Sequence, residues 1–249
     1  MRSSKSSYLR LLAVAYVSVL PFAPGAPAPA SVSSADDPLG AAVEAARKTH
    51  DEKQLHSLKA QLEQIVAQNP NDAGIYLELA KVHEYFLDLY EMRKDKKAAG
   101  EAVDKAMDAA QRSIQLNDKS SDAHSLLADL YGRKISLGNA MFAGPKFGPK
   151  VKEENAKAMA LDDKNPHVWA SLGRQYLMTP KMFGGDVSKA IESLQKSLAF
   201  DTSQDETWVW LAKAFQKQGD RAKAREAIQH AFALNPDSPW VKNAVNSLN

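Results

Sequence analysis

The 249-residue sequence contains no cysteine. This absence excludes disulfide bonds, thiol nucleophiles, zinc sites built on thiolates and lipidation of a cysteine near the N-terminus. A chain without thiols is indifferent to the redox state of its compartment.

An excess of charge of one sign is also lacking. The sequence holds 32 Lys and Arg against 30 Asp and Glu, a formal net charge of +2. Three basic residues, Arg2, Lys5 and Arg10, precede the first acidic residue; without them 29 basic residues face 30 acidic ones. Neither this balance nor any local block of Lys and Arg supports binding to nucleic acid, and we predict no nucleic-acid partner.

No apolar run near the N-terminus is long enough to anchor the chain permanently in a membrane. The apolar run over residues 11–23 has 13 residues and contains Pro21. A helix that spans a bilayer needs about 20 apolar residues. The run, with basic residues before it and small residues after it, is instead typical of a secretory signal peptide.

We therefore predict a signal peptide over residues 1–30, cleaved near Ala30 or Ala35, followed by a short linker over 31–38. The mature protein is expected to be exported, to the periplasm or the cell exterior. Two alternatives stay open. The leader is also rich in Ser and lacks acidic residues before Asp36, as mitochondrial transit peptides do, and it could be retained uncleaved.

Residue patterns of catalytic and metal sites are missing as well. None of the six histidines has the spacing of a helical metal signature, and His83 and His124 fall on apolar stripes, where packed imidazoles are expected. The Gly- and Lys-containing stretch 144–150 lacks the Gly-Lys-Ser/Thr sequence of a phosphate-binding loop. We predict a non-enzymatic protein without cofactor or metal. The rival hypothesis is that His83, His124 or His167 converges with carboxylates in a pocket.

What the chain does contain is a helical hairpin near its C-terminus. One apolar stripe at helical spacing is broken by Gly219 and Asp220, and a second stripe then runs to Pro236. Asp220 is placed to cap the second helix, and small residues on both stripes allow the two helices to approach closely. The two stripes consist of Trp208, Leu211, Ala212 and Phe215, and of Ala224, Ala227, Ile228, Ala231 and Phe232.

The same pattern recurs upstream with insertions between the two helices. We predict five consecutive helix pairs and a final helix over 239–249, in which Trp240 and Val241 cover the end of the last pair. The pairs are predicted over residues 39–72, 73–120, 121–165, 166–204 and 205–238.

This pattern resembles the 34-residue tetratricopeptide repeat (TPR), in which a helix pair recurs with a large, a small and an aromatic residue at set positions. The resemblance implies an all-α fold, a right-handed superhelix of antiparallel helix pairs used as a protein-binding scaffold. The insertions and the Gly184-Gly185-Asp186 loop are also similar to the repeat region of the regulator-of-microtubule-dynamics proteins and their bacterial relatives. No microtubule-contacting residue is carried over by this resemblance.

The concave face of such an array is the expected binding surface. Helical geometry turns one position of each opening helix, and the position one turn later, into the groove. Asp129 and Glu84 interrupt an otherwise basic set, and Lys and Arg are also ordinary residues of solvated helix faces. A largely basic groove would favour a protein or peptide with an acidic segment or a C-terminal carboxylate. The predicted partner-binding residues are Arg47, Lys81, Tyr85, Arg133, Arg174, Met178, Lys213 and Lys217.

The insertions of the second, third and fourth pairs are unusually apolar. The first of them is expected to lengthen its opening helix. The others either pack against each other or form a lip that grips a partner helix or a lipid surface, so membrane association stays an alternative. Their large apolar residues are Phe86, Leu87, Leu89, Tyr90, Met92, Met141, Phe142, Phe147, Met182 and Phe183.

Overall fold

The computed structural model describes residues 38–248, so the predicted signal peptide and nearly all of the predicted linker lie outside the described residues. Within that range the chain is all-α, as predicted, with eleven α-helices, one 3-10 turn and no strand. The helices are α1 (Pro38–Thr49), α2 (Glu52–Gln68), α3 (Ala73–Met92), α4 (Lys96–Leu116), α5 (Ser121–Leu137), α6 (Ala140–Leu161), α7 (Pro166–Met178), α8 (Val187–Phe200), α9 (Asp205–Gln218), α10 (Arg221–Leu234) and α11 (Pro239–Leu248).

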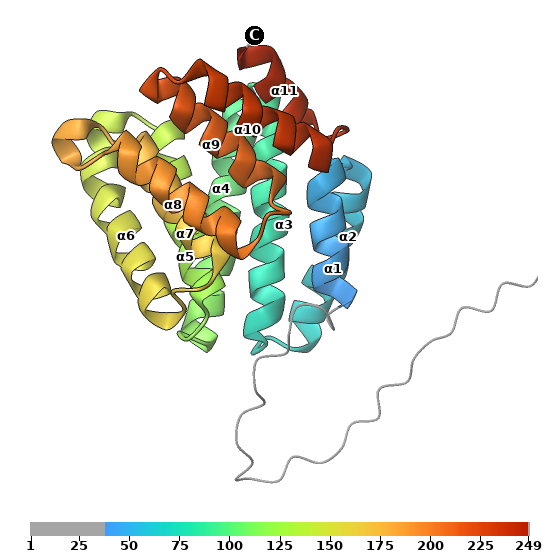
Figure 1. Ribbon diagram of the computed structural model, residues 1–249. Helices are drawn as coiled ribbons and strands as arrows, with labels where there is room; N and C mark the ends of the chain where they lie inside the picture. Colours follow the sequence, from blue (N-terminus) through green and yellow to red (C-terminus); the bar gives the residue numbers. More distant parts are fainter. Residues whose placement is uncertain (1–37, 249) are drawn as a thin grey trace, which may run out of the picture. The chain divides into compact units, whose positions relative to one another are not determined.

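Consecutive helices pack as pairs, α1 with α2 through α9 with α10, and each pair packs on the next (Figure 1). Each of the five predicted segments holds one pair. The last helix, α11, packs against α9 and α10. Its Val241 is fully buried there, and its Trp240 packs against the same apolar cluster.

Polar residues that accept hydrogen bonds from the first turn start most of these helices, which is why their boundaries are sharp. At the last pair, Gly219 has a φ of 95°, and Asp220 accepts a hydrogen bond from the backbone N–H of Lys223, so the predicted break and cap are confirmed. The side chains that cap helices in this way are Asp51, Asp72, Asp95, Ser120, Asn139, Asn165, Asp186, Asp220 and Ser238.

Small residues set the closest approach between paired helices. The predicted small positions Ala212, Ala224 and Ala231 are all buried. A close contact lies between α7 and α8, where a Cβ added at Gly173 would stand 2.5 Å from the Cγ atom of Leu194. Ridges of larger side chains would hold these axes apart, so the stripe of small residues is a packing requirement.

The second and third pairs are longer than the others because their insertions are helical. In α3 the inserted Phe86, Leu87 and Leu89 are buried, which confirms the predicted lengthening of that helix. The insertion of the third pair is helical too, although its Gly and Pro residues are local signals against a helix. Residues 140–150 form the first turns of α6, capped by Asn139 and held by the ring of Phe147, whose centre lies 5.6 Å from that of Tyr131.

Two further sequence interpretations can be checked in the fold. The stretch 144–150 lies inside α6 and is not a phosphate-binding loop. His83 and His124 are both buried, as expected for packed imidazoles; the Nδ1 atom of His124 lies 2.5 Å from Oε2 of Glu154. No helix between residues 38 and 248 is long and apolar enough to span a bilayer.

Candidate functional site

The first helices of all five pairs line one large space, called the central cavity below. Its volume is about 1950 Å³, and its wall is made by residues of α1, α3, α5, α7 and α9, with contributions from α6 and α11. The opening helices therefore face inward, as helical geometry predicted.

Six of the eight predicted partner-binding residues line the central cavity, and Lys213 and Lys217 do not. The Nζ atom of Lys213 lies 4.3 Å from the ring centre of each of Trp210 and Trp240, the two indoles that line the cavity in its place. Burial, with help from the charge of Arg133, lowers the pKa of Lys213 to about 8. The Nζ atom of Lys217 donates to the backbone carbonyl of Leu177, 2.6 Å away. The six that line the cavity are Arg47, Lys81, Tyr85, Arg133, Arg174 and Met178.

The cavity arginines are engaged in ion pairs between neighbouring opening helices. Arg133 of α5 donates to Asp88 and Glu91 of α3, with N–O distances of 2.5 and 2.8 Å. Burial alone would lower the pKa of Arg133, but the carboxylates of Asp88, Glu91 and Glu84 raise it above its ordinary value. This guanidinium is therefore a structural link between the second and third pairs.

The same arrangement recurs one pair later. Arg174 of α7 makes a two-point ion pair with Asp129 of α5, through its Nε and one terminal nitrogen. Asp129 also accepts a hydrogen bond from the hydroxyl of Ser171, 2.9 Å away. Two parallel N–H donors on one carboxylate are the strongest geometry for such a pair, so Arg174 ties α7 to α5.

Arg47 joins the first and last pairs. Its terminal nitrogens lie 2.9 Å from a carboxylate oxygen of Asp205 and 2.9 Å from one of Glu206, both at the start of α9. The side chain of Asn235 adds a hydrogen bond to the carbonyl of Lys48. We call these contacts the α1–α9 clasp. It closes the ring of opening helices around the central cavity.

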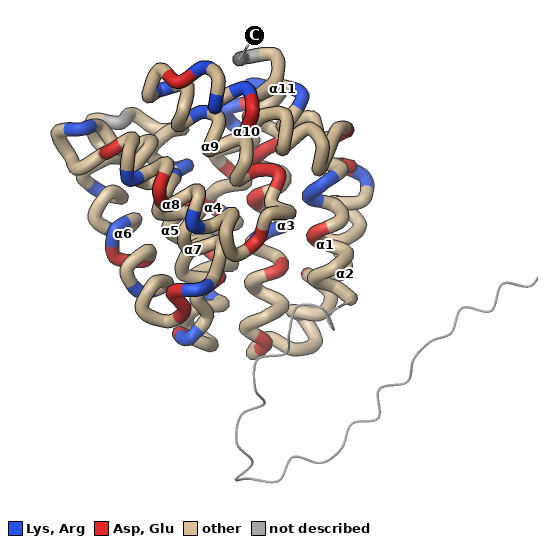
Figure 2. The backbone as a smooth tube through the Cα atoms, viewed as in Figure 1, with Lys and Arg blue, Asp and Glu red and all other residues tan. Residues whose placement is uncertain are grey.

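These pairings correct the expected charge of the groove. The groove was predicted to be largely basic, but ten acidic and seven basic side chains line the central cavity. The prediction was wrong because it considered one or two positions per helix. The four predicted cations that line the cavity, Arg47, Lys81, Arg133 and Arg174, are each met by carboxylates from the same or a neighbouring helix. Figure 2 shows acidic and basic positions close together along α1, α3 and the start of α9.

Two carboxylates of α3 are left without a full set of partners. Glu78 is more than nine-tenths buried and lines the cavity; its Oε1 lies 2.7 Å from the Nζ of Lys81, and its Oε2 has no hydrogen-bond partner. Glu84 lines the cavity without a hydrogen bond or ion pair to any residue in the described range. Burial, together with Asp88 and Asp129, raises the pKa of Glu84 to about 8.

One edge of the central cavity is apolar. Four lining residues, Met141, Met178, Met182 and Phe183, are 58–83% exposed, and we call them the Met/Phe rim. They come from the start of α6, the end of α7 and the 3-10 turn Lys181–Phe183, which Figure 1 shows on the same side of the molecule. Flexible Met side chains suit a surface that adapts to what it binds.

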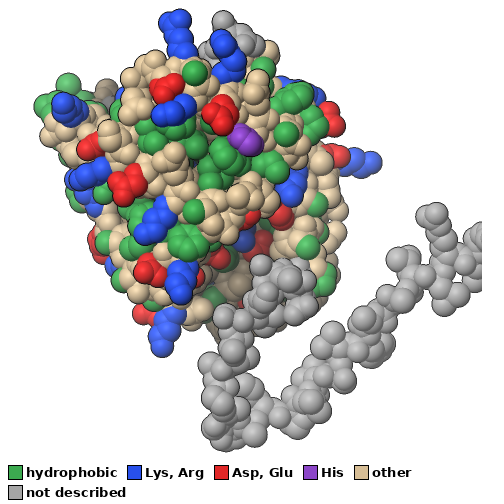
Figure 3. Space-filling model, in the orientation of Figure 1, with side chains coloured by type: hydrophobic (Ala, Val, Ile, Leu, Met, Phe, Trp, Pro, Cys, Tyr) green, Lys and Arg blue, Asp and Glu red, His purple; other side chains and the backbone are tan. Residues whose placement is uncertain are grey.

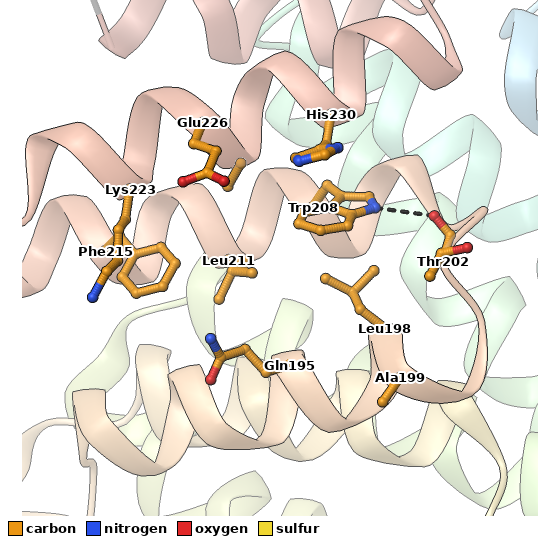
Figure 4. Close-up of a pocket in the computed structure, with 11 residues that line it drawn as sticks. Gln195, Leu198, Ala199, Thr202, Trp208, Leu211, Phe215, Lys223, Glu226 and His230 are labelled. Carbon is orange, nitrogen blue, oxygen red and sulfur yellow. Dashed lines mark hydrogen bonds between the residues drawn. The ribbon is translucent and has the colours of Figure 1, made fainter.

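A second, smaller cavity of about 450 Å³ lies between α8 and the α9–α10 pair (Figure 4). Trp208 forms its floor, stacked on His230 with ring centres 4.4 Å apart and hydrogen-bonded to the carbonyl of Thr202. Leu198, Leu211 and other residues of the packing stripes make up most of its wall. It is therefore a packing gap at the interface between the fourth and fifth pairs.

Figure 3 shows the face that carries α8, α9 and α10, where apolar and charged side chains of both signs are interspersed.

Sequence reasoning missed the acidic half of the central cavity and the clasp. Part of the signal was present, because Glu44 and Glu78 stand three residues before Arg47 and Lys81, the spacing of helical ion pairs. Asp205 lies 158 residues from Arg47, and no local pattern connects them. Among residues 38–248, no group of three or more His, Asp or Glu is arranged to hold a metal ion.

The inward-facing helix pairs define the class of the protein: a TPR-like α-solenoid, a scaffold fold that suggests protein–protein interaction and is generally not enzymatic. The family model of the Regulator of microtubule dynamics protein 1-3 matches residues 42–179, more than half of the chain. The chain therefore belongs to this family. A tetratricopeptide-repeat model matches residues 205–245, which confirms that resemblance as well.

One solved structure shows the same fold. TTC0263, a thermophilic TPR protein of Thermus thermophilus, is 15% identical, covers 84% of this chain and 98% of its own, and superposes with a TM-score of 0.64. PilF of Pseudomonas aeruginosa is 20% identical over 67% of each chain, with a TM-score of 0.44. A search of the curated proteins found no match.

Proposed function

We propose that this protein is a scaffold that holds a segment of a partner protein in the central cavity. The observation that carries the proposal is the cavity itself. At about 1950 Å³ it is well above the roughly 300–1000 Å³ of typical small-molecule sites. A space of this size suits an extended strand or a short helix.

The Met/Phe rim supports the same function. Its four side chains are exposed and lie at the edge of the central cavity, so they are placed to contact apolar residues of a segment that enters it. The same residues could instead contact a lipid surface, which was the alternative raised by their sequence. Flotation of the purified protein with vesicles would favour that alternative.

Gly132 offers a direct test. It lies on α5 and lines the cavity, and a Cβ added there meets no atom within 4 Å. Gly132→Trp should project an indole into the cavity and obstruct a bound segment, whereas Gly132→Ala should leave the space open. Affinity capture with the three proteins, followed by identification of the retained proteins, is the measurement. Partners retained equally by Gly132→Trp and the wild type would refute binding in the central cavity.

We also propose that the chain acts after export, because its first 30 residues have the pattern of a signal peptide. Mass spectrometry of the protein isolated from cells should find a mature N-terminus directly after Ala30 or Ala35. An intact N-terminus would contradict cleavage, and import into isolated mitochondria would favour the transit-peptide alternative.

A further inference from the structure

We infer that the segment held in the central cavity is cationic and that Glu84 of α3 receives an Arg or Lys side chain from it. This inference rests on the proposed function and specifies the chemistry of the partner. It reverses the expectation, drawn from the positions of Lys and Arg in the sequence, of an acidic partner or a chain-terminal carboxylate.

The three arginines of the cavity are already engaged in ion pairs within the protein. Arg133 and Arg174 link neighbouring opening helices, and Arg47 links α1 to α9. An acidic ligand would have to displace a carboxylate of the protein from each of them. The exchange would leave that protein carboxylate partly buried and unpaired, which is costly. These guanidinium groups are therefore poor receptors for a second anion.

The anions of the cavity are in excess. With ten acidic against seven basic lining residues, the wall has three more acidic than basic side chains, and two more anions than cations while Glu84 is protonated. Independently of this balance, Glu78 is more than nine-tenths buried and one of its oxygens has no partner. A polar atom buried without a partner costs stability, and a cation bound nearby in the cavity would reduce that cost through its field.

Glu84 is the carboxylate best placed to bind a cation. It has no hydrogen bond or ion pair with the described residues, and it lies among other charged groups of the wall. A ligand cation beside it would offset the repulsion from the neighbouring carboxylates. The charged groups that act on Glu84 or are acted on by it are Asp88 of its own helix, Asp129 and Arg133 of α5, Arg174 of α7 and Glu206 of α9.

The raised pKa of Glu84, about 8, means that binding of a cation beside it should have a measurable dependence on pH. At pH 7 the free protein holds Glu84 mostly protonated. A bound ammonium or guanidinium stabilises the carboxylate, so binding should release a proton from Glu84 into the buffer. The affinity for a cationic segment should therefore increase as the pH rises toward 8.

The Met/Phe rim completes the description of the ligand. Apolar side chains at the edge and carboxylates in the wall fit a segment in which Arg or Lys alternates with apolar residues. A second protein that carries such a segment is the occupant that we propose.

The test uses three 14-residue peptides with acetylated and amidated ends and the same Leu and Ala positions, differing only in whether three sites hold Arg, Gln or Glu. Affinities for the purified protein are measured by fluorescence anisotropy, and proton release by calorimetry in two buffers of different ionisation enthalpy. The variants are Glu84→Gln, the matched surface control Glu101→Gln on α4, and Gly132→Trp.

We expect the Arg peptide to bind at least tenfold more tightly than the Gln peptide, and the Glu peptide to bind more weakly than either. Glu84→Gln should remove most of the preference for Arg and the proton release, and Glu101→Gln should change neither. Equal binding of the Arg and Glu peptides, or an unchanged preference in Glu84→Gln, would overturn the inference. If all three peptides bind equally and Gly132→Trp blocks them, only the charge inference fails. If Gly132→Trp blocks nothing, the proposed function fails with it.

Discussion

The second and third helix pairs and the last pair use the same two-helix unit for different purposes. In the last pair the helices have 14 residues each, and their apolar stripes pack against each other and against neighbouring helices. In the second and third pairs the opening helices have 20 and 17 residues. The last turns of α3 carry Asp88 into the wall of the central cavity and Glu91 beside it, where both pair with Arg133 of α5. Regular repeat positions supply Glu84 and Arg133, and the added turns of α3 supply the carboxylates that pair with Arg133.

The largest expected effect separates buried ion pairs from exposed ones. Arg133→Met leaves Asp88, which is buried, and Glu91 without their cation. Loss of one partner of a buried pair costs about 3–5 kcal/mol of the free energy of unfolding. The control is Lys223→Met in the last pair, whose ion pair with Asp220 is exposed and should contribute little. Urea denaturation measures both. Similar midpoints for the two variants would contradict a structural role for Arg133.

The α1–α9 clasp is expected to hold the first pair in place. Arg47→Met should lower the free energy of unfolding by about 2–3 kcal/mol, because Asp205 is almost fully buried and keeps only its hydrogen bond to Asn235. Hydrogen exchange should speed up in α1 and in the first turn of α9 more than in α4. Uniform exchange in all three helices would argue that the clasp contributes nothing.

Glu84 should make stability depend on pH. A folded-state pKa of about 8, against an ordinary value of 4.5, means that the folded protein binds more protons than the unfolded chain between these values. Stability contributed at low pH is therefore lost as the pH rises from about 4.5 to 8. Glu84→Gln removes this loss and should raise the free energy of unfolding at pH 9 by roughly 2 kcal/mol, allowing for solvent in the cavity. A variant no more stable than wild type at pH 9 would show that folding does not raise the pKa of Glu84.

The smallest effect distinguishes the close contact between α7 and α8 from the open cavity wall on α5. Gly173→Ala would force a Cβ against Leu194, at a cost of at least about 1 kcal/mol. Gly132→Ala enters open space in the middle of α5 and should stabilise that helix by about 0.5–1 kcal/mol. Thermal denaturation of the two variants should therefore shift in opposite directions. Destabilisation by both would mean that the wall at Gly132 is closed.

The fold was predictable from the sequence because each helix pair carries its own apolar stripes and breaks. For example, the positions of Trp208, Phe215 and Gly219 are sufficient to predict the last pair from its own sequence. The inward positions of Arg47, Arg133 and Arg174 followed from the same helical geometry and were predicted correctly.

The charge of the site was not predictable in the same way. Whether Arg47 meets Asp205 depends on the sum of small rotations between five successive pairs, which no local spacing encodes. The helical start of α6 was missed because Gly144, Pro145 and Pro149 are local signals against a helix. Packing of Phe147 on Tyr131 and the cap of Asn139 outweigh those signals.

Because the chain has no cysteine, a single introduced thiol can be labelled without interference. Ser136→Cys places a small environment-sensitive fluorophore at an exposed position of the central cavity, and Ser57→Cys places it on α2, away from the cavity. The account predicts that the Arg peptide shifts the emission of the label at position 136 in a saturable way and leaves position 57 unchanged. A response at position 57 with none at 136 would place the binding surface elsewhere on the molecule.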